Sequence, residues 1–219
     1  MIKAVLFDLD GTIADTNSLI FESFRHTFRT HSIQGVSDQE IYSFFGEPLI
    51  QSMRRYAPDQ AEELVETYRQ YNQMVHDDMI RHFPGVREML TELQDMGLAL
   101  AIVTSKRSEA ALRSLNALEL KRHFEVVVTP EATLLHKPNP EPVLHGVKLL
   151  GVEPRQAIMV GDSPYDLLAG RSAGTWTCGV EYTRLNLEIL RQAKPDFMIA
   201  AAQDLIPIIN QLNQEETNR

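Results

Sequence analysis

The chain has 219 residues, of which 43% are hydrophobic and 23% are charged, so it can bury one sizeable core with a small second domain and is not disordered throughout. A formal net charge of −9 at pH 7 argues against nucleic acid as the main partner, because phosphate backbones are bound by clustered lysine and arginine. The single cysteine, Cys178, cannot form an intramolecular disulfide, and no apolar run has the length of a bilayer span or the pattern of a signal peptide, so we expect a cytoplasmic protein with no membrane partner.

The chain opens with a short apolar run, AVLF at residues 4–7, which is typical of a buried strand and ends at Asp8. The next stretch, residues 15–82, has the pattern of helix throughout. Its longest part, residues 58–80, is an amphipathic run that begins at a proline. An all-helical insert directly after the first strand predicts a cap domain.

After the insert, apolar runs alternate with amphipathic segments. The apolar runs are short and do not alternate between apolar and polar residues, as in strands buried on both faces of a parallel sheet, and they lie at residues 98–104, 124–129, 156–161 and 176–180. The amphipathic segments lie at residues 84–97, 108–118, 139–151 and 163–174. This alternation predicts an α/β fold with a doubly wound, mainly parallel, Rossmann-like sheet. The predicted domains are a core of residues 1–14 and 83–219 and a helical cap of residues 15–82.

Four carboxylates lie where predicted strands end. Asp8 and Asp10 follow the first strand, and Asp162 and Asp166 follow the strand at 156–161. Ligands of doubly wound sheets bind at the carboxyl ends of the strands, so we expect these groups to share one cleft. Clustered carboxylates repel one another unless a cation lies between them, and a set of hard oxygen ligands suits Mg²⁺. The alternative is that Asp8 and Asp10 only form a turn, where aspartate is common.

Hydroxyls and a lysine are predicted at the same edge. Thr104 and Ser105 end the second run, and Lys137 precedes Pro138 in the loop after the third run. A lysine fixed beside carboxylates is a point charge that can stabilise a bound phosphoryl group and an ionised aspartate. These residues predict phosphate chemistry on a small phosphorylated substrate. The alternative for Lys137 is a solvated surface residue, as most lysines are.

The motifs DLDGT, VTSK, HKPNPEP and GDSPYD occur in this order, each at the end of a predicted strand. Together they resemble the four motifs of the haloacid dehalogenase-like superfamily, specifically its phosphatases with a helical C1-type cap inserted after the first motif. The resemblance covers nearly the whole chain. It implies a Mg²⁺-dependent phosphohydrolase that acts through an aspartyl-phosphate, and we expect a monomer or a small homo-oligomer.

The resemblance also implies roles for the catalytic residues. Asp8 would be the nucleophile that takes the phosphoryl group. Asp10 would protonate the leaving group and would then act as the base that activates water. Thr104 and Lys137 would hold the transferring phosphoryl group, with Ser105 as a supporting neighbour.

The metal ligands follow from the same resemblance. Asp8, Asp162 and the backbone carbonyl of Asp10 would bind Mg²⁺, and Asp166 would support the metal or orient Lys137. Members of the superfamily that act on carbon–halogen bonds lack the second aspartate of the first motif. The presence of Asp10 therefore favours phosphoryl transfer.

The cap is expected to select the leaving group. In the stretch FFGEPLIQSMRR, Gly46 comes before a proline where a helix could begin and face an anion, and Arg54 and Arg55 follow about two turns later. Both arginines could equally be solvated. The stretch resembles the cap of a pyrophosphatase and phosphoglycolate phosphatase group, which makes inorganic pyrophosphate the first expected substrate and phosphoglycolate the alternative.

Three other classes remain as hypotheses. A sugar-phosphate mutase of the same fold would pass its phosphoryl group to a sugar phosphate instead of water. A phosphorylated receiver domain would also carry a strand-end aspartate and a lysine, but it would lack the helical insert. A non-catalytic binding module would release no phosphate, although every motif position in this chain carries the residue that catalysis needs.

Overall fold

The computed structural model describes residues 1–45, 47–182, 184 and 187–217, and it divides into two compact units. The core unit comprises Met1–Asp15 and His82–Arg219, and the helical unit comprises Thr16–Arg81. The chain therefore leaves the core unit just after its first strand and returns to it once. Among the described residues, every helix is too short or too polar to serve as a membrane span.

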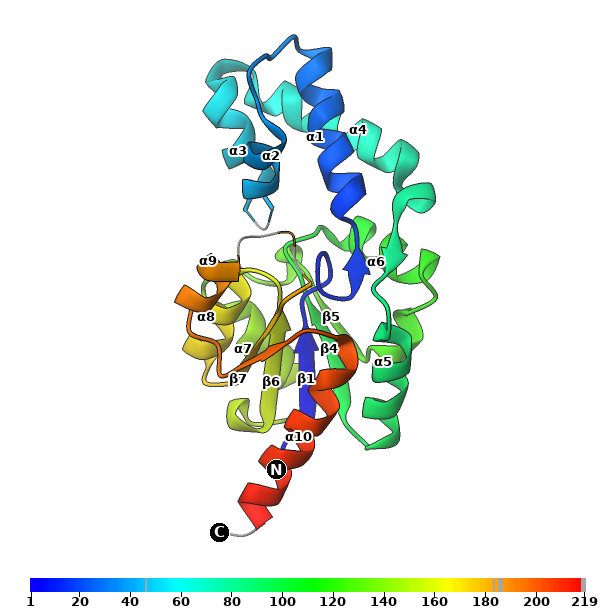
Figure 1. The fold of residues 1–219 in the computed structure, drawn as a ribbon, viewed down its shortest axis with the longest axis vertical. Helices are drawn as coiled ribbons and strands as arrows, with labels where there is room; N and C mark the ends of the chain where they lie inside the picture. The colour runs from blue at the N-terminus through cyan, green and yellow to red at the C-terminus, as the bar shows by residue number, and fades with distance from the viewer. Residues whose placement is uncertain (46, 183, 185–186, 218–219) are drawn as a thin grey trace. The chain divides into compact units, whose positions relative to one another are not determined.

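The core unit is built on a six-stranded sheet in the order β5-β4-β1-β6-β7-β8, with β1 near its centre (Figure 1). Its strands are β1 (Ala4–Phe7), β4 (Ala99–Val103), β5 (Val126–Val128), β6 (Ala157–Gly161), β7 (Trp176–Val180) and β8 (Phe197–Ile199). All five neighbouring pairs are parallel, which confirms the predicted doubly wound α/β class. A second sheet pairs β2 (Ala14–Asp15) with β3 (Arg81–His82).

The last strand, β8, was not among the strands predicted from the sequence. It is only three residues long, and Phe197 pairs in register with Cys178 of β7. A run this short, directly after a Lys-Pro-Asp turn, lacks the length that distinguishes a strand from a loop. The strand forms because β7 offers an open edge to pair with, which is a property of the assembled sheet and not of the local sequence.

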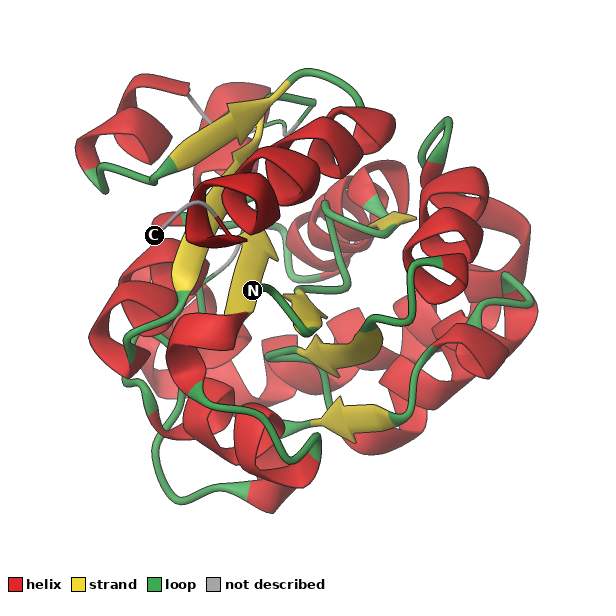
Figure 2. Ribbon diagram, turned by 90° about the horizontal axis from the view of Figure 1, so that it is seen from below, coloured by secondary structure: helices red, strands yellow, loops and turns green. Residues whose placement is uncertain are grey.

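Helices lie on both faces of this sheet (Figure 2). The core-unit helices are α5 (Val86–Asp95), α6 (Ser108–Ala117), α7 (Glu141–Leu149), α8 (Pro164–Ala173), α9 (Leu187–Gln192) and α10 (Leu205–Thr217). The 3₁₀ turns of this unit are η2 (Lys121–His123), η3 (Pro130–Ala132), η4 (Pro154–Gln156) and η5 (Ala202–Asp204). Helix α7 packs on β1, β4 and β5, α8 packs on β6 and β7, and the two helices contact each other, so they form one layer.

The layer between the sheet and α7 and α8 is a continuous apolar core. Its buried members are Ala4, Leu6, Ala101, Val103, Val128, Val143, Val147, Ala157, Met159, Ala169 and Ala173. Gly146 lets α7 approach closely, because a Cβ at this position would lie 2.8 Å from Leu6 Cδ2. This packing holds β1, β4 and β6 rigidly, and with them the residues that follow these strands.

The helical unit contains α1 (Asn17–Thr30), α2 (Asp38–Ser43), α3 (Leu49–Tyr56), η1 (Pro58–Gln60) and α4 (Ala61–Met79). Helices α1 and α4 pack against each other, and an aromatic cluster fills the space between the helices, with ring centroids 5.2 Å apart for Phe24 and Phe44 and 5.3 Å apart for Phe28 and Tyr56. Ser37 begins α2 with a capping box to Glu40, which supplies the first N–H groups of that helix with acceptors.

Candidate active site

Asp8 lies at the carboxyl edge of the sheet, immediately after the central strand β1. Its backbone N–H donates to Val160 O at 2.9 Å, and the preceding Phe7 is in register with Ile102 of β4 and Val160 of β6. Parallel strands that end together bring their following residues to one place. The register therefore sets Asp8 between the loops that follow β4 and β6.

Lys137 is buried against Asp8, with a side chain that is 4% exposed. Its Nζ donates to Asp8 Oδ1 at 2.6 Å, to Asp166 Oδ1 at 2.5 Å and to Val103 O at 2.9 Å. An ammonium group has three N–H donors, so this lysine has an acceptor for each of them. Lys137 is thus a fixed positive charge between two carboxylates, not a solvated surface residue.

The electrostatics of this group are set by burial and by charge pairing. Burial raises the pKa of Asp8 to about 7; Lys137 opposes that rise, and the nearby carboxylates of Asp166 and Asp10 add to it. Burial lowers the pKa of Lys137, but the carboxylates of Asp166 and Asp8 outweigh it and leave that pKa above its ordinary value. The lysine therefore stays charged, and burial remains the largest influence on the pKa of Asp8.

Asp166 is held in place by the start of α8. Its Oδ2 accepts the backbone N–H of Ser163 at 3.1 Å and the Ser163 hydroxyl at 2.6 Å, and Ser163 in turn caps the helix. Its Oδ1 accepts from Lys137. Because both of its oxygens accept hydrogen bonds, Asp166 fixes Lys137 relative to the first turn of α8.

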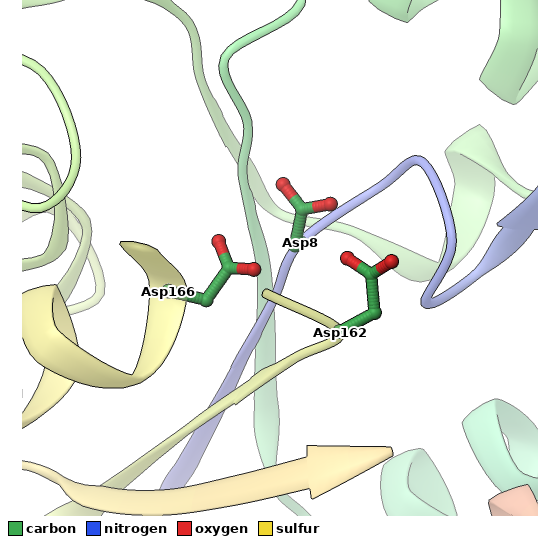
Figure 3. A group of neighbouring side chains, drawn as sticks. All are labelled: Asp8, Asp162 and Asp166. Atoms are coloured by element: carbon green, nitrogen blue, oxygen red, sulfur yellow. The ribbon is translucent and has the colours of Figure 1, made fainter. Parts of the chain in front are cut away.

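Three buried carboxylates meet at this edge: Asp8, Asp162 and Asp166 (Figure 3). One oxygen from each lies within 4.8 Å of the other two. Gly11 packs directly against Asp162, since a Cβ at Gly11 would overlap the Asp162 carboxylate, and its φ of +84° also favours glycine. The turn after β1 is thus shaped to fit closely around the carboxylate at the end of β6.

Asp10, the second carboxylate of the first motif, pairs with a lysine. Lys106 Nζ donates to Asp10 Oδ1 at 2.9 Å, and the two side chains are 14% and 22% exposed. The Lys106 backbone N–H donates to Thr104 Oγ1 at 3.1 Å, which turns the loop after β4 toward Asp10. Asp10 is therefore more accessible than Asp8 and has its own cation.

Thr104 and Ser105 lie on the same side of the site as Lys137. Thr104 is 6% exposed and its backbone N–H donates to Val128 O at 3.0 Å, whereas Ser105 is exposed. Both residues line one pocket together with Lys137. The hydroxyls that the sequence singled out thus lie beside the buried lysine.

The sequence suggested three substrate-binding residues in the predicted cap: Gly46, Arg54 and Arg55. Gly46 lies outside the described residues. Arg54 pairs with Glu62 at 3.2 Å, and Arg55 pairs with Glu47 at 2.6 Å, with both arginine side chains more than half exposed. Within the helical unit, each arginine is therefore already compensated by a carboxylate.

Two residues of the site were not singled out from the sequence. Lys106 stands in the VTSK motif, and its place two residues after Thr104 was a usable signal. Tyr182 donates its hydroxyl to Thr12 O at 3.2 Å and packs its ring on Phe83 at 4.8 Å between centroids, so it anchors the turn after β1. The contact between Tyr182 and Thr12 spans 170 residues of sequence and has no local pattern.

The burial of Lys137 predicts a large loss of stability when it is removed. Lys137→Ala leaves Asp8 and Asp166 buried without their cation, which costs about 3–5 kcal/mol for a broken buried ion pair. Urea unfolding at pH 8 measures this loss. The control is Lys148→Ala in α7, where an exposed lysine should cost less than about 0.5 kcal/mol. A loss below about 1 kcal/mol for Lys137→Ala would show that the lysine is not held as described.

Comparisons with known proteins agree with this arrangement. The model of the haloacid dehalogenase-like hydrolase family matches residues 5–180. A protein of Clostridium perfringens with the name "Putative pyrophosphatase PpaX" is 45% identical, over 97% of this chain and 100% of its own length. Pyrophosphatase PpaX of Bacillus cereus is 37% identical, over 97% of this chain and 99% of its own length.

Solved structures give the same result. One described as a predicted phosphoglycolate phosphatase from Haemophilus somnus superposes with a TM-score of 0.83 at 26% identity, covering 94% of this chain and 97% of that one. The family match spans most of the chain and includes all three carboxylates of the cluster, Asp8, Asp162 and Asp166. The chain therefore belongs to the haloacid dehalogenase-like hydrolase family and is an enzyme, a hydrolase whose relatives are phosphatases.

Proposed function

We propose that this protein is a Mg²⁺-dependent phosphohydrolase that forms an aspartyl-phosphate at Asp8 and acts on a small phosphorylated substrate, with inorganic pyrophosphate as the first candidate. The observation that carries the proposal is the buried contact of Lys137 with Asp8, next to the carboxylate of Asp162. It supplies a nucleophile, a fixed positive charge and a set of metal ligands within one group of side chains. The helical unit is proposed as the cap that selects the leaving group.

The donor set fits Mg²⁺ on its chemistry. The clustered ligand atoms of Asp8, Asp162 and Asp166 are all carboxylate oxygens, and hard oxygen ligands are what Mg²⁺ prefers. Both oxygens of Asp166 already have partners, so Asp8 and Asp162 are the proposed ligands, with the Asp10 carbonyl as a third. When bound, the ion would offset the negative charge of the carboxylates and of the phosphoryl group.

The reaction is proposed to proceed in two displacements on phosphorus. An Asp8 oxygen forms a bond to phosphorus while the bond to the leaving oxygen breaks, and that oxygen takes a proton from Asp10. Water then forms a bond to phosphorus, gives its proton to Asp10, and the Asp8–phosphorus bond breaks. Thr104 would donate its hydroxyl to a phosphoryl oxygen. Lys137, whose three donors have acceptors in the protein, would stabilise the charge of the phosphoryl group as a fixed cation beside Asp8.

The choice of pyrophosphate is supported by the PpaX names of the relatives from Clostridium perfringens and Bacillus cereus. The Haemophilus somnus structure supports phosphoglycolate as the second candidate. Both substrates leave an anion behind after phosphoryl transfer. We further propose a cytoplasmic location, in which the buried Cys178 would remain a free thiol.

The proposed roles predict the behaviour of two variants. With Mg²⁺, the wild type should release phosphate, and kcat/KM across pyrophosphate, 2-phosphoglycolate, sugar phosphates and nucleotides should rank the substrates. Asp8→Asn should lower kcat by roughly 10³-fold or more, because an amide cannot form the phosphoenzyme. Asp10→Asn should lower kcat by roughly 10²- to 10⁴-fold, the usual contribution of an acid–base group.

The control for both variants is Asp95→Asn, which changes an exposed aspartate at the end of α5 and should keep full activity. Substantial turnover by Asp8→Asn would rule out Asp8 as the nucleophile. A sugar bisphosphate product in place of free phosphate would indicate a mutase instead.

Metal binding should stabilise the protein more at pH 8 than at pH 5.5. In the metal-free fold the pKa of Asp8 is raised to about 7, above its unfolded value of 3.8. Between these two pH values the folded state holds a proton on Asp8 that the unfolded state has lost, so the free energy of unfolding falls as the pH rises from about 4 to about 7. At pH 5.5, Mg²⁺ must displace that proton, whereas at pH 8 it meets an ionised carboxylate.

Thermal melting with and without Mg²⁺ measures this effect. At one fixed Mg²⁺ concentration, about 100 times Kd at pH 8, the gain in stability should be about 2.7 kcal/mol at pH 8 and smaller at pH 5.5, where the apparent Kd is larger. Asp162→Asn should abolish most of the increase, and Asp95→Asn should keep it. An equal increase in Asp162→Asn, or a larger one at pH 5.5 than at pH 8, would contradict the assignment of the ligands.

A further inference from the structure

Lys106 is the second lysine at the carboxyl edge of the sheet, and its surroundings differ from those of Lys137. Each of the three donors of Lys137 has an acceptor in the protein. Within the described part of the chain, Lys106 Nζ has one acceptor, Asp10 Oδ1 at 2.9 Å. An ammonium has three N–H donors, so two of them can be offered to a bound molecule.

The position of Lys106 relative to Asp10 indicates which part of a substrate it would meet. An acid that protonates a leaving oxygen must come within about 2.6–3.2 Å of it. A leaving oxygen that accepts a proton from Asp10 would lie near Lys106 Nζ, which contacts the same carboxylate. Lys137, by contrast, contacts the proposed nucleophile Asp8 and would lie near the transferring phosphoryl group.

We propose that Lys106 binds an anionic leaving group, so that the site selects phosphoryl groups attached to a phosphate or a carboxylate-bearing alcohol over those attached to a neutral alcohol. The inference rests on the proposed function, because it takes Asp10 as the acid–base group. It adds a contribution of the core unit to the selection proposed for the helical unit, because Asp10 and Lys106 follow the neighbouring strands β1 and β4.

The arginines of the helical unit are weaker candidates for this task. Arg54 and Arg55 pair with Glu62 and Glu47, and both arginine side chains are more than half exposed, so solvent and salt screen their charge. The Lys106 side chain is 14% exposed, so its charge is screened less.

A structural role for Lys106 would make different predictions from a binding role. If the lysine only positions Asp10, its loss should slow all substrates whose leaving oxygen needs a proton, whatever their charge. If it binds the leaving group, its loss should slow only those with a charged one. A matched pair of substrates separates the two: 2-phosphoglycolate and its neutral amide, which have the same leaving alcohol apart from the carboxylate charge.

The experiment measures kcat/KM for pyrophosphate, 2-phosphoglycolate and the amide with wild type, Lys106→Met and Lys106→Arg. We expect Lys106→Met to lose roughly 10- to 100-fold on the two anionic substrates, as for one charge-assisted hydrogen bond, and less than about 3-fold on the amide. Lys106→Arg should recover part of the loss. Lys148→Met, at an exposed position of α7, is the control and should match the wild type.

Each other outcome overturns the inference. Equal losses on all three substrates would leave Lys106 as a positioning residue for Asp10, and unchanged kinetics would remove it from the site. Should Lys106→Met fail to fold, as judged by circular dichroism, the wild type alone decides, because equal kcat/KM for 2-phosphoglycolate and the amide excludes recognition of the charge. A wild type that hydrolyses neither these three substrates nor the sugar phosphates and nucleotides of the screen refutes the proposed function itself, whereas loss of selectivity alone refutes only the role of Lys106.

Discussion

The contact of Lys137 with Asp8 and Asp166 is the interaction on which the site depends. It joins three segments that are far apart in the sequence: the end of β1, the loop before α7 and the first turn of α8. Burying these charges is costly, and only their close pairing offsets that cost. The result is a carboxylate held beside a buried cation, which is the arrangement that the proposed role of Asp8 as nucleophile requires.

The fold supports this contact from two directions. The register of β1 with β4 and β6 fixes Asp8, and the capping box between Ser163 and Asp166 fixes the partner of the lysine at the start of α8. Asp166 thus belongs to the capping box of α8 and also accepts a hydrogen bond from Lys137, so a shift of α8 would move the acceptor of the lysine. Gly11 adds the third constraint, because only a residue without a Cβ lets the turn after β1 lie against Asp162.

Much of the fold could be predicted from the sequence, since short apolar runs and amphipathic segments alternate, and the resulting parallel sheet is the one observed. The strand β8 could not, because three residues carry no period and pair only with an edge that exists after folding. The sequence also indicated which acids lie at strand ends. It could not show that Lys106 contacts Asp10 or that Tyr182 holds Thr12, because such distances depend on how loops turn. The arginine pairs with Glu47 and Glu62 were hidden for the same reason.

The most direct test of the account is to identify the atom that receives the phosphoryl group. The enzyme is mixed with Mg²⁺ and radiolabelled pyrophosphate, quenched in acid during turnover, and digested for mass spectrometry. We predict a phosphorylated peptide modified at Asp8, and label that decays more slowly once formed in Asp10→Asn, because the second displacement lacks its base. Label on a different side chain, or rapid turnover with no label in either protein, would contradict the account.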